Sequence, residues 1–82
     1  MADTTRIRTI LATAEHDTER SDLFLLSQGR MLDLAIAVRA KPWITAGIAD
    51  VILCSRARTV AGHAIQAAAR EWREWIAERA TV

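Results

Sequence analysis

At 82 residues the chain is long enough for one domain with a modest core, and we treat residues 1–82 as a single helical domain. Eleven basic and ten acidic side chains leave a net charge of +1, which excludes a strongly basic surface that would attract polyanions along its whole length. Apolar residues make up 51% of the chain and aromatic residues only 5%, a balance in which alanine, a strong helix former, is prominent.

The composition also excludes several classes of protein. A single cysteine, Cys54, excludes an internal disulfide and is typical of a reducing compartment. Charged residues interrupt every apolar run that approaches the length of a membrane span, so we expect no membrane insertion. The first residues lack the apolar core of a secretion signal. The expected protein is soluble and cytoplasmic.

The first predicted helix begins at Thr4 or Thr5, either of which can cap it. Its apolar residues recur at helical spacing and are Ile7, Ile10, Leu11 and Ala14. The polar stretch 16–22 follows and offers new capping residues. We therefore expect the first helix to end or bend there.

The second predicted helix begins near Thr18 or Ser21 and runs towards Ala40. Its apolar residues are Leu23, Phe24, Leu25, Leu26, Met31, Leu32, Leu34, Ala35, Ile36 and Val38. Because these positions cover most of the circumference of a helix, we expect this helix to be the central and most buried one. The sequence leaves open whether the helix breaks at Gln28-Gly29.

Pro42 predicts the start of a third helix, since proline fits the first helical position and disfavours helix in the residue before it. The apolar side of this helix is expected to contain Trp43, Ile44, Ile48, Val51 and Ile52. Ser55 can cap a fourth, long helix with a packing stripe at three- and four-residue spacing, namely Ala57, Ala61, Ala64, Ala68, Trp72 and Trp75. The pattern leaves open whether these two helices are fused.

These patterns predict an all-α fold, a small bundle of three to four helices with a long C-terminal helix. Alanine-rich helix faces allow close approach but bury little area. We therefore expect a homodimer that uses the alanine-rich C-terminal helix to complete the bundle. Dimerisation is a second expectation, separate from the fold class.

The sequence offers little material for catalysis, so we expect no enzyme and no cofactor. Cys54 and His63 would lie on poorly aligned helix faces, which argues against a nucleophile–base pair. No serine lies in a glycine-flanked turn. His16 with Glu15 or Glu19 gives at most a partial set of metal ligands, so no metal site is predicted either.

Residues 43–66 carry a local resemblance to a known family. The segment contains Ile48-Ala49-Asp50, Leu53-Cys54-Ser55, Thr59-Val60 and His63. This succession resembles the helix-turn-helix core of LuxR-type response regulators. The resemblance implies that the helix after Ser55 is a recognition helix that presents Arg56, Arg58 and Thr59 to DNA. A DNA-binding transcriptional regulator is therefore the alternative function.

The segment from Arg70 to Arg79 gives the leading functional hypothesis. Tryptophan and arginine are the residues most enriched at binding hot spots. The candidate partner-binding residues are Arg70, Trp72, Arg73, Trp75 and Arg79. Burial of both tryptophans in the bundle or in a dimer seam is the competing interpretation. We expect a non-enzymatic interaction module, a small regulator or inhibitor of a host protein such as phages and mobile elements encode.

Overall fold

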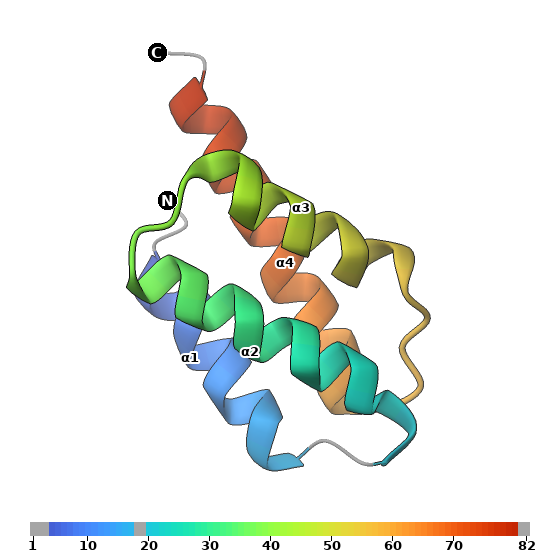
Figure 1. Ribbon diagram of the computed structural model, residues 1–82. Helices are drawn as coiled ribbons and strands as arrows, with labels where there is room; N and C mark the ends of the chain where they lie inside the picture. The colour runs from blue at the N-terminus through green and yellow to red at the C-terminus, as the bar shows by residue number, and fades with distance from the viewer. Residues whose placement is uncertain (1–3, 18–19, 81–82) are drawn as a thin grey trace.

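The computed structural model describes residues 4–17 and 20–80, and these ranges contain four α-helices and no strand (Figure 1). The elements in order are α1 (Thr4–Asp17), a short 3-10 helix η1 (Arg20–Asp22), α2 (Leu23–Ala37), α3 (Pro42–Cys54) and α4 (Val60–Ala80). The all-α prediction is confirmed, as is the start of the third helix at Pro42. Thr18, one of the two predicted starts of the second helix, lies outside the described residues.

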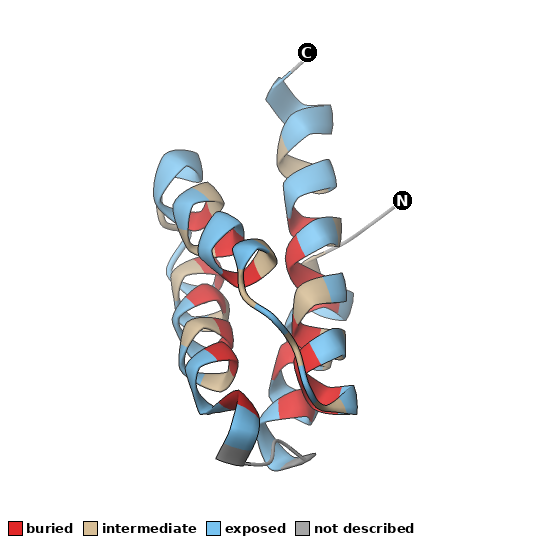
Figure 2. Ribbon diagram, turned by 90° about the vertical axis from the view of Figure 1, so that its right-hand side faces the viewer, coloured by how far each residue is buried: buried red, intermediate tan, exposed pale blue. Residues whose placement is uncertain are grey.

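The four helices form an antiparallel bundle in which each helix runs opposite to the one before it (Figure 1). Figure 2 shows two layers, α1 with α4 and α2 with α3, whose buried sides face each other. Both α2 and α4 pack against all three other helices, but α4 makes the more extensive contacts and has six buried residues against four in α2, so α4 is the central element. At 21 residues it is also the longest described helix, and its C-terminal end projects beyond the bundle (Figure 1).

The α1 helix packs as its sequence pattern predicts. Ile7, Leu11 and Ala14 are buried at spacings of four and three residues. Ion pairs tie its polar flanks to the neighbouring helices, with Arg8 Nε 2.9 Å from Asp33 Oδ1 on α2 and Arg6 Nη2 3.3 Å from Glu71 Oε1 on α4. Such surface pairs contribute at most about 1 kcal/mol each, so burial of the apolar stripe supplies most of the stability.

A loop over residues 55–59 separates α3 from α4, which settles the question that the sequence left open. The predicted cap of the fourth helix was wrong. Ser55 ends α3, and its hydroxyl donates to the carbonyl oxygen of Val51 at 2.9 Å. Thr59 caps α4 instead, because its Oγ1 accepts a hydrogen bond of 2.9 Å from the backbone N–H of Gly62.

The alanine-rich stripe of α4 is a packing seam, as predicted, but it lies inside the chain. Ala61, Ala68 and Trp72 are buried, and Ala57, Ala64 and Trp75 are partly buried against the same core. Since α1 and α3 pack against α4 within one chain, this stripe is not available as a dimer interface. Dimerisation through the C-terminal helix would have to use another of its sides, and it stays a prediction.

Asp22 links the start of α2 to the start of α4 through hydrogen bonds. It stands at the N-cap position of α2, makes no capping bond there and is only 2% exposed. Its carboxylate instead accepts hydrogen bonds from the backbone N–H groups of Arg58 at 3.1 Å and Thr59 at 2.8 Å, and from the Thr59 hydroxyl. Gly62 leaves room for it, because a Cβ atom at that position would lie 2.0 Å from Asp22 Oδ2. We call this arrangement the Asp22 clasp.

The α2 helix ends in a Schellman motif that places an arginine where glycine is usual. The N–H of Ala40 donates to the carbonyl of Ala35 at 2.9 Å, and the N–H of Arg39 donates to that of Ile36 at 3.1 Å. Arg39 has a φ of 55°, in the left-handed region that is unfavourable for a residue with a Cβ atom. This residue therefore holds backbone strain.

We expect Arg39→Gly to raise the free energy of unfolding by about 1 kcal/mol, because glycine adopts the left-handed conformation without steric cost. Arg39→Ala is the matched control, since it removes the charge and keeps the strain. Urea unfolding of the two variants measures the difference. A gain that is equal in both variants would assign the effect to the charge and contradict the prediction.

Candidate functional site

The outer side of α2 is apolar and exposed, contrary to the prediction that this helix is the most buried one. Its buried residues, Leu25, Gly29, Leu32 and Ile36, follow a single stripe at spacings of four and three. Opposite this stripe, Phe24, Met31 and Val38 recur every seven residues, and Leu34 lies between the last two. The exposed fraction of these four side chains is between 50% and 68%.

The outer side of α3 also departs from prediction. Its buried residues are Thr45, Ala49 and Ile52, whereas the expected core residues Trp43, Ile44 and Val51 are 67%, 48% and 42% exposed. Lys41 places its Nζ 5.1 Å from the centre of the Trp43 ring, a cation–π contact that restrains an otherwise exposed indole.

These side chains belong to one surface, because α2 and α3 pack side by side in the same layer (Figure 2). We call it the apolar α2–α3 face, and it comprises Leu23, Phe24, Met31, Leu34, Val38, Trp43, Ile44 and Val51. Exposed apolar residues that occur singly are ordinary, whereas a group of this size on two neighbouring helices is typical of a binding surface. Methionine and aromatic residues, both present here, are enriched at protein interfaces.

The sequence contained a signal for this face that the interpretation missed. Both helices carry apolar residues around most of their circumference, and a chain of 82 residues cannot bury two such helices completely. A surplus of apolar residues in a small domain therefore indicates an exposed face as readily as a central helix.

Of the candidate partner-binding residues, three lie together. Trp72 is 6% exposed, and its ring stacks on the partly buried ring of Trp75, with centroids 4.9 Å apart and planes 14° apart. The guanidinium carbon of Arg79 lies 3.8 Å from the centre of the Trp75 ring. Trp72 thus belongs to the core, and Trp75 with Arg79 forms the accessible part of this cluster.

The other two candidate residues, Arg70 and Arg73, do not join this cluster. Arg70 is exposed and lies about 180° round the helix from Arg79, at about 100° per residue. Arg73 Nη1 lies 3.3 Å from Asp50 Oδ1 and so faces α3. The five residues therefore do not form one surface, and their role in binding a partner stays a prediction.

The candidate DNA-binding residues lie in the loop before α4, because that helix begins at Val60 and not directly after Ser55. Arg56 and Arg58 are exposed. The Thr59 hydroxyl is held by Asp22, and the backbone N–H groups of Arg58 and Thr59 already bind that carboxylate. The start of α4, a site that often binds phosphate in other proteins, is thus occupied by an anion of the chain itself.

No group of three or more histidine, cysteine, aspartate or glutamate side chains lies close enough to share a metal ion in the part of the chain that the structure describes. Among the described helices, none combines the length and the apolar character needed to cross a bilayer.

The fold and the exposed face together define a four-helix bundle with an apolar side. Compared with models of protein families, with curated proteins and with solved structures, the chain matches none of them.

Proposed function

We propose that the protein is a non-enzymatic interaction module, a small regulator or inhibitor that docks on another protein through its apolar α2–α3 face. The observation that supports this proposal is the exposure of eight large apolar side chains on the outer sides of two adjacent helices. Covering them removes apolar area from water at about 25 cal/mol per Å², the main driving force in protein association. The partner surface would be an apolar groove or a flat apolar patch.

The geometry of the face favours docking of the preformed α2 and α3 helices on a partner over capture of an extended peptide by this face. The stripes on α2 and α3 lie on rigid helices whose other sides are fixed in the core, at Leu32 and Ile52 for example. A preformed surface of this kind loses little conformational entropy on binding. Trp43, restrained by Lys41, is a candidate hot spot within it.

We expect the double variant Met31→Glu/Leu34→Glu to lose partner binding by more than tenfold, because two carboxylates would be buried at the interface without partners. Both side chains are at least half exposed, so the fold should retain its stability. The measurement is capture of proteins from a lysate of the native host on immobilised protein, before and after nuclease treatment.

Ala67→Glu is the matched control, since it adds a carboxylate at an exposed position of α4 outside the face. One stoichiometric protein that is retained by the unsubstituted chain and by Ala67→Glu, and lost from the double variant, would support the proposal. Equal retention by all three chains would contradict it. Retention of nucleic acid alone, weakened by Arg56→Ala and Arg58→Ala and by rising salt, would support the DNA-binding alternative.

A further inference from the structure

A cavity of about 450 Å³ lies where the start of α1, the end of α2, the start of α3 and the last turns of α4 meet. Its apolar walls are Ile36, Pro42, Trp72, Trp75 and Ile76. The volume is within the range of about 300–1,000 Å³ that is typical of small-molecule sites. The cavity opens at the end of the bundle and is separate from the apolar α2–α3 face.

One side chain that lines the cavity carries a hydrogen-bond donor without an acceptor. The Nε1–H group of Trp72 is buried and has no hydrogen-bond partner among the described residues. Buried polar atoms without partners are rare in folded proteins, since each one loses its bond to water on folding. Trp72 lines the cavity with other atoms of its ring, because Nε1 itself is buried, so a ligand there would contact the ring and the N–H would report that contact.

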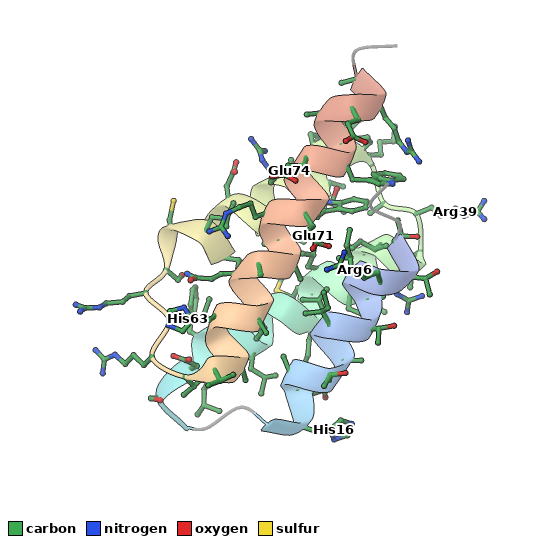
Figure 3. The ribbon with its side chains drawn as sticks, turned by 180° about the vertical axis from the view of Figure 1, so that it is seen from behind. Arg6, His16, Arg39, His63, Glu71 and Glu74 are labelled. Carbon is green, nitrogen blue, oxygen red and sulfur yellow. The ribbon has the colours of Figure 1, made fainter. Side chains whose placement is uncertain are left out.

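The charge at the cavity is positive. Arg39 and Arg79 are among the described residues that line it, and none of those lining residues is acidic. Stacking on Trp75 at 3.8 Å holds the Arg79 guanidinium in place, and its N–H edge can still donate to an anion. Arg39 stands on the loop beside the cavity with its side chain directed away from the bundle, so it adds positive charge at the mouth (Figure 3).

We propose that this cavity binds a small carboxylate with an apolar tail. The tail packs against the indole rings and Ile76, while the carboxylate accepts hydrogen bonds from the Arg79 guanidinium. One fixed guanidinium matches a single carboxylate, and the apolar walls favour a tail without polar groups. This site is additional to the docking function proposed for the α2–α3 face.

The test uses the full chain carrying Trp43→Phe, so that Trp72 and Trp75 are its only indoles. Octanoate is titrated while fluorescence and the NMR signal of the Trp72 indole N–H are recorded. We expect saturable binding and a change in the chemical shift of that signal, because the ligand contacts the Trp72 ring. Octanol, which has the same tail and no charge, should bind about tenfold more weakly.

Arg79→Gln should weaken octanoate binding about tenfold and leave octanol binding unchanged. Arg73→Gln is its matched control on the side of α4 that faces α3, and should change neither. Both positions are exposed, so the two variants should fold normally. Equal affinity for octanoate and octanol, no shift of the Trp72 N–H signal, or equal effects of the two substitutions would each overturn the proposal.

Discussion

Replacing Asp22 with alanine should lower the free energy of unfolding by about 3 kcal/mol, a large part of the stability of so small a domain. The substitution removes the acceptor for the backbone N–H groups of Arg58 and Thr59 and for the Thr59 hydroxyl. Hydrogen bonds to a charged group contribute about 1.5–3 kcal/mol, and the donors left behind remain covered by the loop. Urea unfolding followed by circular dichroism measures the loss.

Asp33→Ala is the matched control for this substitution, because Asp33 is also a carboxylate at the α2 helix but forms a surface ion pair with Arg8. Its loss should cost less than about 1 kcal/mol. Comparable losses in the two variants would show that Asp22 contributes only as an ordinary surface charge.

The Asp22 carboxylate also makes the free energy of unfolding depend on pH. Burial by itself raises the pKa of Asp22. Hydrogen bonds from the Thr59 hydroxyl and from the backbone N–H groups of Arg58 and Thr59 outweigh this effect, as does the nearby His63, and together they hold the pKa below the ordinary value of 3.8. The stabilisation that ionised Asp22 provides is therefore complete at pH values above its ordinary pKa. It is lost as the pH falls through the lower pKa of the folded state. Below pH 4, unfolding of Asp22→Ala should depend less on pH than unfolding of the unsubstituted chain.

We expect Gly62→Ala to destabilise the fold by about 2–4 kcal/mol, although alanine is the better helix former by about 1 kcal/mol. The added Cβ would lie 2.0 Å from Asp22 Oδ2 and 3.3 Å from the Cβ of Ala57. The carboxylate would have to move, and its hydrogen bonds at the start of α4 would be lost with it. Thermal or urea unfolding of the single variant measures the effect.

Two further variants decide whether the Asp22 clasp is the cause. In the Asp22→Ala background the oxygen is gone, so Gly62→Ala should become neutral or stabilising, a reversal that a double-mutant cycle detects. Gly47→Ala is the control for helix propensity, because a Cβ there meets nothing within 4 Å. If Gly62→Ala were as benign as Gly47→Ala, the proposed crowding would be disproved.

Local signals predicted the helices well. Pro42 marks the start of α3 because its effect on the backbone acts within one residue, and the α1 stripe of Ile7, Leu11 and Ala14 follows directly from helical spacing. The alanine stripe of α4 was likewise recognised as a packing seam. Its partner was not, because periodicity shows that a face is buried without showing which surface covers it.

Contacts between distant residues could not be predicted in the same way. Asp22 is followed by an apolar helix and therefore looks like an ordinary N-cap, yet it binds groups 36 and 37 residues away. Thr59 and Ser55 are both suitable caps by residue type, and only the fixed position of Asp22 favours Thr59. The exposed sides of α2 and α3 escaped prediction because apolar residues surround both helices.

The apolar α2–α3 face also has a consequence for how the protein behaves in solution. With a net charge of only +1, copies of the chain repel one another weakly, so electrostatics does little to keep such faces apart at high concentration. Under the proposed docking function, the form with an uncovered face is the one most prone to precipitate. Synthesis of the protein in step with the partner that covers this face would limit that form.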